Sequence, residues 1–380
     1  MSEKKFTLQA AVTFGLEAVA KREAAKIGFE QIRASDGYVE FKASSEDIVK
    51  ANLNFRCVDR IMLVLKKFKV LDFEELFEGV YSVDWCDILP ENAQFIVTGK
   101  SIKSLLSSVP AIQSVSEKAI IKKLQTKYAR DNFSKDGARY IIQIGLLKDE
   151  VTVLLNTSGP SLHKRGYRTD QGLAPLKETM AAALIELSFW KNERIFLDPC
   201  CGSGTIPIEA ALIARNIAPG LYRHFDFEKQ GIIDANIVKQ EKINARSAID
   251  FNVTPQIYGS DINKRAIEMS LKNSANAGVD DCIVFEQIPF NKLVLPGDYG
   301  VCVSNPPYGE RMGESSDVER LYRDMGRLFG KNNTWSAYIL TSNESFEKFY
   351  GKRADKKRKL FNGNVKVDYY QFFGQKPTSK

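Results

Sequence analysis

The chain has 380 residues, an apolar content of 44% and a net charge of +7; this length exceeds one ordinary core and predicts two or three domains. No stretch approaches the roughly 20 uninterrupted apolar residues of a membrane span, and the charged start Met1–Lys5 leads into no signal-peptide core, so we expect a soluble, cytoplasmic protein. Six cysteines without a Cys-x-x-Cys pair and only two histidines disfavour zinc and iron–sulfur sites, so we expect no metal and reduced thiols.

The N-terminal part predicts two small α+β units without a convincing catalytic constellation, which we interpret as a binding module. Apolar residues recur at helical spacing over 16–27, with Thr13 as candidate N-cap and Gly28 as stop signal. The other expected elements are a hairpin of 29–33 with 38–41, helix 46–55, strand 61–68, helix 73–77, strand 93–98, helix 114–129 and strands 140–144 and 150–155.

Residues 170–380 alternate strands and helices as a doubly wound α/β domain does. Helix 174–184 is expected to cover a ligand cleft, residues 216–250 read as an insertion, and the helix after residue 308 carries an apolar stripe with Asp317 as its cap. The other expected elements are strands 194–198, 256–261, 282–286, 299–304 and 335–341, helix 206–214, a helix from 263, and a hairpin of 359–361 with 365–373 around Asn362-Gly-Asn364.

The strand 194–198 ends in Asp198 and runs into a glycine loop, Pro199-Cys-Cys-Gly-Ser-Gly-Thr205, that opens a helix. Gly202 and Gly204 carry no Cβ, so the backbone can approach a ligand closely. The loop lacks the Gly-Lys-Ser/Thr of a phosphate loop and the third glycine of a dinucleotide fingerprint. An acid before the glycines suits a ligand with a cationic amino-acid portion, such as S-adenosylmethionine. Cys200 and Cys201 fit the loop as small side chains, and we interpret neither as a nucleophile.

Another acid, Asp261, closes the strand 256–261. At that position a carboxylate can accept two hydrogen bonds from ribose hydroxyls, although the spacing from the glycines exceeds the usual 20 or so residues. Asp261 is also a candidate N-cap for the helix that begins at Asn263, and the two roles can coexist.

The segment Asn305-Pro-Pro-Tyr308 follows the apolar run 299–304, where open α/β sheets keep their chemistry. These residue types suit methylation of an exocyclic amino group on a ring. The Asn305 amide oxygen and the Pro306 carbonyl can each accept one N–H, which aims the nitrogen lone pair at a methyl donor. The prolines stiffen the backbone, and Tyr308 offers a face for stacking a base. The alternative is a plain turn after a strand.

Two basic runs flank this candidate site, Leu162-His-Lys-Arg-Gly-Tyr-Arg168 and Lys352-Arg-Ala-Asp-Lys-Lys-Arg-Lys359. The second lies in a stretch that reads as turn-rich. Charge runs are usually solvated surface, but these two flank a site that must admit a polyanion, which favours phosphate contacts.

Together, Asp198–Thr205, Asn305-Pro-Pro-Tyr-Gly-Glu-Arg311, the run 162–168 and Ala174-Pro-Leu-Lys-Glu178 resemble the THUMP-domain RNA methyltransferases, in particular bacterial enzymes similar to the guanine-N2 methyltransferase of 23S ribosomal RNA. The resemblance spans nearly the whole chain. It implies a ferredoxin-like domain over 1–68, an RNA-binding THUMP domain over 69–165, and a class I, Rossmann-like α/β methyltransferase domain with a mixed seven-stranded sheet over 166–380.

The resemblance also implies roles for individual residues. The cofactor S-adenosylmethionine is expected to contact Asp198, Cys200, Gly202, Gly204, Thr205, Asp261, Ile262, Glu286 and Asn305. The target base is expected to contact Asn305, Pro306, Pro307 and Tyr308. Structured RNA, ribosomal or transfer, is expected to contact Lys164, Arg165, Arg168, Arg311, Lys352, Arg353, Lys356 and Lys357. Related enzymes hold the adenine amino group of the cofactor with an acid near the strand 282–286; the aspartate expected after Phe285 is missing, and only Glu286 and Gln287 are near enough to replace it.

The motifs predict an S-adenosylmethionine-dependent N-methyltransferase that acts on the exocyclic amino group of a base, and the resemblance implies that the substrate is RNA and that the favoured target is guanine N2 in 23S ribosomal RNA. Two rivals stay open. An adenine-N6 methyltransferase of DNA or RNA would share the Asn-Pro-Pro-Tyr motif, and a non-catalytic RNA-binding assembly factor would keep the cleft without using it.

Overall fold

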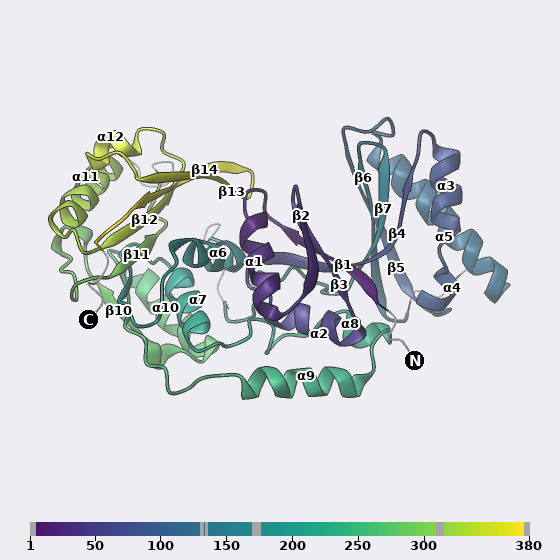
Figure 1. Cartoon of the computed structure of the whole chain (residues 1–380), viewed down its shortest axis with the longest axis horizontal. Helices are drawn as coiled ribbons and strands as arrows, with labels where there is room; N and C mark the ends of the chain where they lie inside the picture. Colours follow the sequence, from purple (N-terminus) through teal and green to yellow (C-terminus); the bar gives the residue numbers. More distant parts are fainter. Residues whose placement is uncertain (1–4, 130–132, 134–135, 169–175, 309–314, 376–380) are drawn as a thin grey trace.

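The computed structural model describes residues 5–129, 133, 136–168, 176–308 and 315–375, and it contains two seven-stranded β-sheets placed one beyond the other along the long axis (Figure 1). The strand order is β2-β3-β1-β4-β7-β6-β5 in the N-terminal sheet and β10-β9-β8-β11-β12-β14-β13 in the C-terminal sheet. In the part of the chain that is described, no helix is long and apolar enough to cross a membrane.

The N-terminal sheet begins with a strand that the sequence reading missed. Strand β1 buries Leu8, Ala10 and Val12, while the residues between them are only partly buried, so its buried apolar face is short. Helix α1 begins at Glu17 with Leu16 at its N-cap, so the prediction of Thr13 as N-cap is wrong, whereas Gly28 ends the helix at φ 99° as predicted. The elements are β1 (Phe6–Val12), α1 (Glu17–Ile27), β2 (Glu30–Ser35), β3 (Tyr38–Ala43), α2 (Ser45–Asn54) and β4 (Val58–Lys69).

The next segment continues the same sheet, because β7 pairs antiparallel with β4. The two small units expected from the sequence therefore share one sheet, and the expected boundary at residues 68 and 69 falls at the end of the strand that joins them. The elements are α3 (Phe73–Tyr81), α4 (Trp85–Ile88), β5 (Gln94–Ile102), α5 (Val109–Tyr128), β6 (Arg139–Leu147) and β7 (Glu150–Asn156).

The C-terminal sheet is parallel from β10 to β12 and antiparallel at β14 and β13, which makes it the mixed seven-stranded sheet that was predicted. Its elements are α6 (Glu178–Ser188), β8 (Phe196–Asp198), α7 (Thr205–Ala214), α8 (Phe227–Gln230), α9 (Ala235–Ser247), β9 (Ile257–Asp261), α10 (Lys264–Ala277), β10 (Ile283–Gln287), β11 (Val301–Ser304), α11 (Ser315–Lys331), β12 (Ser336–Thr341), α12 (Phe346–Tyr350), β13 (Lys356–Asn362) and β14 (Val365–Phe372), with short 3₁₀ turns at Asp280–Cys282 and Phe290–Lys292.

Three details of this half differ from the expectations. Helix α6 begins at Glu178, and residues 174 and 175 lie outside the described ones. Asp317 lies inside the first turn of α11, so it does not precede the helix as a cap; there its carboxylate lies 3.9 Å from Arg320. The basic residues 356–359 lie in the edge strand β13 and not in a turn. Lysines on an edge strand are a usual device against strand-to-strand aggregation.

The insertion 216–250 joins the two halves of the molecule. Helix α9 packs against α2, as Figure 1 shows along the lower side of the molecule. The Gly220 N–H donates to the Leu53 carbonyl at 2.9 Å, and the Tyr140 hydroxyl donates to the Gln230 carbonyl at 2.6 Å. One hydrophobic core accordingly includes residues of the N-terminal strands and apolar residues of α6 and α7. This shared core fixes the N-terminal module beside the C-terminal sheet.

Candidate functional site

Three parallel strands end side by side at one edge of the C-terminal sheet. Strand β8 lies between β9 and β11, with Asp198 opposite Gly259 of β9 and Cys302 of β11 opposite Leu197. The chain therefore brings Asp198, Asp261 and Asn305 to the same carboxyl edge, where ligands of open α/β sheets bind. The two motifs that the sequence singled out, more than one hundred residues apart, are neighbours here.

A short hydrogen bond joins these two motifs. The Ser304 hydroxyl donates to Asp198 Oδ1 at 2.7 Å, and both side chains are buried. The Cys200 N–H donates to the same carboxylate oxygen at 3.2 Å. Burial raises the pKa of Asp198 from its usual 3.8 to about 7, although these two hydrogen bonds lower it and the nearby charge of Asp261 raises it further. Asp198 thus fixes the loop that follows it to the strand end that precedes Asn305.

The two glycines of the loop are required for different reasons. Both have left-handed backbones, with φ 54° at Gly202 and 82° at Gly204. A Cβ on Gly204 would lie 2.7 Å from the Ser270 Cβ, so this glycine is needed for packing against α10. Among the described residues, none has an atom within 4 Å of a Cβ placed on Gly202, so none of them fills the space beside this glycine. Gly202 is therefore the point of the loop at which a ligand can approach the backbone.

Asp261 supports the loop from the neighbouring strand. Its Oδ2 accepts the Gly202 N–H at 3.0 Å and its Oδ1 accepts the Asn263 N–H at 2.9 Å. The helix that follows has Asn263, not Asp261, as its N-cap, so the capping alternative for Asp261 is wrong. Each carboxylate oxygen has a second lone pair for a ligand hydroxyl. The next residue, Ile262, is 60% exposed and places an apolar surface beside this carboxylate.

The candidates for holding an adenine are on the outermost parallel strand. Glu286 and Gln287 lie at the end of β10, and both are exposed. The Gln287 side-chain amide donates to the Ile262 carbonyl at 3.1 Å, which fixes it beside that apolar residue. Glu286 remains a candidate by position alone.

The segment Asn305–Tyr308 is held in place by a residue that sequence reasoning assigned only to the core. The buried Tyr322 of α11 donates its hydroxyl to the Pro307 carbonyl at 3.1 Å, and the same oxygen lies 2.9 Å from Thr341 Oγ1 at the end of β12. Because a phenol has one hydrogen, the Thr341 hydroxyl is the donor to Tyr322. The loop is therefore supported at both ends, by Ser304 before Asn305 and by Tyr322 after Pro306.

Within the segment, the Tyr308 hydroxyl donates to the Asn305 amide oxygen at 2.5 Å. That oxygen is the acceptor expected for the amine of a target base. The Tyr308 ring is partly buried against the core that includes α6 and α7. This bond uses one of the two lone pairs of the Asn305 oxygen, so a base that enters the site either shares this acceptor with Tyr308 or displaces the Tyr308 hydroxyl.

Two of the predicted RNA contacts in the run 162–168, Arg165 and Arg168, have side chains that lie inside the protein. Arg165 is 5% exposed, pairs with Glu209 of α7 at 3.4 Å, and donates to the carbonyls of Leu162 and Arg56 at 2.7 and 2.5 Å. The prediction that Arg165 contacts RNA is wrong, because its guanidinium is buried and its N–H donors are engaged with these partners.

Arg168 is also engaged inside the protein. Its side chain is 12% exposed and donates to Thr205 Oγ1 at 2.5 Å and to the Leu176 carbonyl at 2.6 Å, with Glu178 3.5 Å away. Arg168 therefore binds Thr205, the first residue of α7, instead of making the predicted contact with RNA. The Thr205 hydroxyl oxygen accepts this hydrogen bond.

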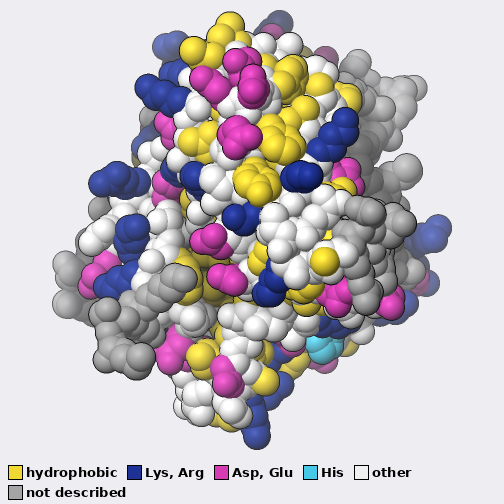
Figure 2. Space-filling model, turned by 90° about the vertical axis from the view of Figure 1, so that its right-hand side faces the viewer, with side chains coloured by type: hydrophobic (Ala, Val, Ile, Leu, Met, Phe, Trp, Pro, Cys, Tyr) yellow, Lys and Arg dark blue, Asp and Glu magenta, His cyan; other side chains and the backbone are white. Residues whose placement is uncertain are grey.

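The other predicted RNA contacts lie on the surface. Lys164, Lys352, Arg353, Lys356 and Lys357 are exposed. Lys352 is 3.9 Å from Asp355 and Lys357 is 3.5 Å from Asp368, both in partly exposed pairs. Arg311 lies outside the described residues. The end of the molecule that carries α3 and α5 shows basic side chains spread around exposed apolar ones, with acidic side chains among them (Figure 2).

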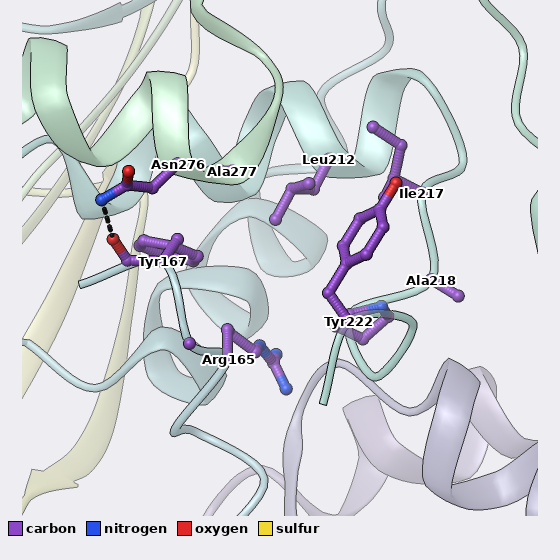
Figure 3. Close-up of a pocket in the computed structure, with 10 residues that line it drawn as sticks. Arg165, Tyr167, Leu212, Ile217, Ala218, Tyr222, Asn276 and Ala277 are labelled. Carbon is purple, nitrogen blue, oxygen red and sulfur yellow. Dashed lines mark hydrogen bonds between the residues drawn. The ribbon is translucent and has the colours of Figure 1, made fainter. Parts of the chain in front are cut away.

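A small pocket lies away from the strand ends. Its volume is about 110 Å³, and its lining comes from residues 165–167, from the C-terminal ends of α7 and α10, and from residues 217–222 of the insertion (Figure 3). Tyr167 and Tyr222 stand on opposite sides of it, and the Asn276 amide donates to the Tyr167 carbonyl at 3.0 Å. Leu212, one of its walls, is about 10 Å along α7 from Thr205. Cofactor-sized pockets usually exceed about 300 Å³, so this cavity is not the cofactor site.

The thiols near the site are not nucleophiles. Burial raises the pKa of the Cys200, Cys201 and Cys302 thiols well above the ordinary value, so they stay protonated. Among the described residues, no group of three or more histidine, cysteine or acidic side chains is arranged to hold a metal ion.

Sequence reasoning missed Ser304, Tyr322 and Thr341. Ser304 carried a signal, because it is the one polar residue at the end of an otherwise apolar strand next to the motif. Tyr322 and Thr341 carried none that distinguishes a supporting hydroxyl from a core residue.

Three family models match the chain. The RMKL-like methyltransferase domain matches residues 165–371, which is more than half of the chain. The RlmL ferredoxin-like domain matches residues 7–62, and the THUMP domain matches residues 71–156.

The chain is also similar to proteins matched over its full length. It is 45% identical over 374 residues to "Putative RNA methyltransferase YpsC" of Bacillus subtilis (strain 168), which covers 98% of this chain and 97% of that relative. It is 33% identical over 367 residues to "Ribosomal RNA large subunit methyltransferase K/L" of Shewanella baltica (strain OS195), which covers 95% of this chain and 52% of that relative. The chain thus spans about half the length of the K/L relative.

Two solved structures are similar throughout. One is described as "a putative methyltransferase complexed with SAH", where SAH is S-adenosylhomocysteine; it has a TM-score of 0.92, 44% identity, and coverage of 99% of this chain and 100% of that one. The other, from Listeria monocytogenes, is described as "a predicted N6-adenine-specific DNA methylase" and has a TM-score of 0.93, 44% identity, and coverage of 98% and 97%.

Proposed function

The chain belongs to the RMKL-like methyltransferase family, and we propose that it transfers the methyl group of S-adenosylmethionine to the exocyclic amino group of a purine in structured RNA, most of all N2 of a guanine in 23S ribosomal RNA. S-adenosylmethionine is the cofactor of this family, as the SAH complex of the 44% identical structure indicates. The cofactor supplies an activated methyl group on a sulfonium.

One observation carries the proposal. The Ser304 hydroxyl ties the strand end before Asn305 to Asp198, at 2.7 Å, and Asp198 opens the glycine loop. The group that would accept the amine and the loop that would hold the cofactor are therefore fixed to each other through a single buried hydrogen bond. Positioning of two reactants in this way supplies most of the rate of a methyl transfer that needs neither a metal nor a covalent intermediate.

The residues of the site fit the cofactor. The open space over Gly202 leaves room for a ligand against the backbone. The Asp261 carboxylate, oriented by the N–H groups of Gly202 and Asn263, can accept ribose hydroxyls, and the exposed Ile262 offers an apolar face to an adenine. Asp198 supplies a carboxylate close to the loop for the cationic amino-acid portion.

The target amine is held by Asn305 and Pro306. The Asn305 amide oxygen and the Pro306 carbonyl accept its two N–H bonds and draw the lone pair out of conjugation as charge develops. The Asn305 oxygen has a second lone pair for the amine beside the one that Tyr308 uses, and release of the Tyr308 hydroxyl would free the ring to stack on the base. Pro307 contributes through its carbonyl, which Tyr322 holds in place.

The N-terminal module is proposed to carry the RNA. We retain 1–68 as ferredoxin-like, 69–165 as THUMP and 166–380 as methyltransferase domain. Surface cations available for phosphates are Lys164, Lys352, Arg353, Lys356 and Lys357. Ribosomal RNA is favoured over transfer RNA by the names of the K/L relatives. An enzyme with this substrate is expected in the cytoplasm.

The first test replaces the acceptor. Asn305→Ala is expected to lower turnover at least about 100-fold, because one preorganised polar partner of the transition state is lost, while S-adenosylmethionine affinity stays nearly unchanged. Turnover is measured with tritiated cofactor and affinity by calorimetry. Asn252→Ala, an exposed asparagine after α9, serves as control. Unchanged turnover in Asn305→Ala would remove Asn305 from the mechanism.

The second test identifies the target. Mass spectrometry of nucleosides from 23S, 16S and transfer RNA of a deletion strain is expected to show loss of part of the N2-methylguanosine of 23S RNA, restored by the wild-type gene and not by Asn305→Ala. The Asn-Pro-Pro-Tyr motif and the Listeria relative's description favour adenine N6 as second candidate. Loss of N6-methyladenine from DNA or RNA, with N2-methylguanosine intact, would establish that candidate instead.

A further inference from the structure

The hairpin β13–β14 extends beyond the edge at which the site lies. Thr341, the last residue of β12, pairs with Asp368 of β14, and β14 and β13 continue to pair for three more positions, at Val367, Lys366 and Val365. At about 3.3 Å per residue, the hairpin projects about 10 Å past the end of β12. Because β12 is parallel to β11, this is the side of the sheet from which Asn305 emerges.

The projecting tip meets the loop between β1 and α1 of the N-terminal module. The Phe361 ring of β13 lies 6.1 Å from the Phe14 ring at an angle of 68°. A Cβ on Gly15 would lie 3.0 Å from the Lys359 carbonyl, so backbone meets backbone here. Figure 1 shows the ends of β13 and β14 beside the start of α1. The two aromatic rings thus bridge the two halves of the molecule beside the catalytic edge.

Phe14 is exposed although its loop is held firmly. Its side chain is 56% exposed. The Glu17 carboxylate accepts the N–H groups of Gly15 and Gly37, each at 2.9 Å, and the Leu16 N–H donates to the Thr13 carbonyl at 3.0 Å. The contact with Phe361 covers only part of the Phe14 ring, and the rest of this apolar ring is held in contact with water, which is unfavourable.

The surroundings of the two rings are cationic. Lys359 lies two residues before Phe361 on the same face of β13, and Lys366 lies directly opposite Phe361 on β14. Both lysines are exposed. The neighbouring acids are engaged elsewhere, since Asp368 lies 3.5 Å from Lys357 and Glu17 binds backbone N–H groups. An exposed ring, Phe14, beside the half-buried ring of Phe361 and among cations matches single-stranded nucleic acid, which offers flat bases and phosphates.

We propose that Phe14 and Phe361 form a stacking platform for an unpaired nucleotide of the RNA that flanks the target base, with Lys359 and Lys366 at its phosphates. This inference rests on the proposed function and names where that substrate strand runs. Strand β13 lies three strands from β11, which at about 4.8 Å per strand is about 14 Å. A few nucleotides span this separation, so one strand can reach both the platform and Asn305.

The platform is tested by the variants Phe14→Ala, Phe14→Leu, Phe14→Tyr and Phe361→Ala, with Phe251→Ala as matched control. Phe251 is 68% exposed and lies after α9, on the insertion. RNA affinity is measured by fluorescence anisotropy with a labelled oligouridylate of about ten nucleotides, because stacking tolerates any base. Methyl transfer is measured with unmethylated 23S RNA transcripts, and thermal melting verifies folding.

Phe14→Ala and Phe361→Ala are each expected to lower oligouridylate affinity about tenfold and to raise the KM for RNA by a similar factor, with kcat and S-adenosylmethionine affinity unchanged. The double variant is expected to lose less than the product of the single losses, because both rings serve one nucleotide. Phe14→Leu, which keeps apolar packing without a π face, should behave like Phe14→Ala. Phe14→Tyr and Phe251→Ala should behave like wild type.

The platform would be overturned, and the proposed function left intact, by the following result: the wild-type protein binds and methylates RNA, and Phe14→Leu and Phe361→Ala have the same RNA affinity and KM as Phe251→Ala. A wild-type protein that binds no RNA at all would overturn both.

Discussion

At the scale of single residues, the reacting segment depends on hydroxyl groups that lie behind it. Tyr322 connects the Pro307 carbonyl with Thr341 at the end of β12. Its ring is fully buried, with an edge-to-face contact to Phe346 at 4.8 Å. The packing of the Tyr322 ring and the hydrogen bonds of its hydroxyl can therefore be tested separately, because Tyr322→Phe removes only the hydroxyl oxygen.

Tyr322→Phe is expected to lower kcat about fivefold with little change in the KM for S-adenosylmethionine, because a lost hydrogen bond of about 1 kcal/mol loosens the loop in the transition state. Steady-state kinetics measure this split. Tyr370→Phe is the matched control, since the Tyr370 hydroxyl is buried without a hydrogen-bond partner in the described chain. Equal kinetics for the two variants would mean that Tyr322 only fills the core.

Asp198 makes stability depend on pH. Burial raises its pKa from 3.8 to about 7 in the folded protein, so between these values the folded state holds a proton that the unfolded chain has released. The contribution of Asp198 to the free energy of unfolding is therefore full below about pH 4 and is lost as pH rises to about 7. Its full size is about 4 kcal/mol.

The difference in unfolding free energy between wild type and Asp198→Asn is accordingly expected to decline from pH 4 to pH 7 and to level off above it. Urea denaturation at a series of pH values measures this difference, and the asparagine keeps the size of the side chain while it abolishes the titration. Two curves that run parallel over this range would show that Asp198 does not titrate there.

At the scale of elements, the glycine loop separates a packing requirement from a ligand requirement. Gly204→Ala places a Cβ 2.7 Å from Ser270 of α10 at positive φ and is expected to destabilise the fold by about 3 kcal/mol. Gly202→Ala places its Cβ in open space and is expected to cost only about 1 kcal/mol of stability while S-adenosylmethionine affinity falls at least tenfold.

Thermal melting and calorimetry on the two glycine variants distinguish these roles, and each variant serves as the control for the other. Wild-type cofactor affinity in Gly202→Ala would place the cofactor away from that backbone.

At the scale of the whole molecule, buried polar groups connect the N-terminal module to the methyltransferase domain. Arg165 reaches Glu209 of α7 and the Arg56 carbonyl of the N-terminal module, and the Tyr167 hydroxyl reaches Glu209 at 3.2 Å. Glu209 is fully buried. Removal of one partner leaves a buried carboxylate without its cation, which is far more costly than loss of a surface pair.

Arg165→Met is therefore expected to lower the free energy of unfolding by about 3–5 kcal/mol. Lys164→Met, at the exposed neighbouring position, is expected to change it by less than about 0.5 kcal/mol. Denaturant unfolding measures both, and the double variant Arg165→Met/Glu209→Gln should recover part of the loss. An Arg165→Met protein as stable as Lys164→Met would show that Glu209 finds compensation in water or in neighbouring groups.

Motifs and elements with local signals were predictable. The apolar strands that precede Gly202 and Asn305 and the hairpin around Gly363 have their signals in contiguous sequence, so the predictions of these strands and of the hairpin are confirmed. Strand β1 was missed because its apolar face is made of only Leu8, Ala10 and Val12. Arg165 was misassigned because a Lys-Arg run reads as surface, and its partner Glu209 is 44 residues away in the chain.

The sequence by itself determined the methyltransferase family, and it predicted the chemistry of the site because the glycine loop and the Asn-Pro-Pro-Tyr segment are each contiguous, with residue types that suit a cofactor cradle and an amine acceptor. Only the tertiary structure decided which groups support them. Ser304 meets Asp198 across 106 residues and Phe14 meets Phe361 across most of the chain. Such pairings are set by strand order and by burial, and a polar or aromatic residue has the same local sequence signal whether it faces solvent, a partner or a substrate.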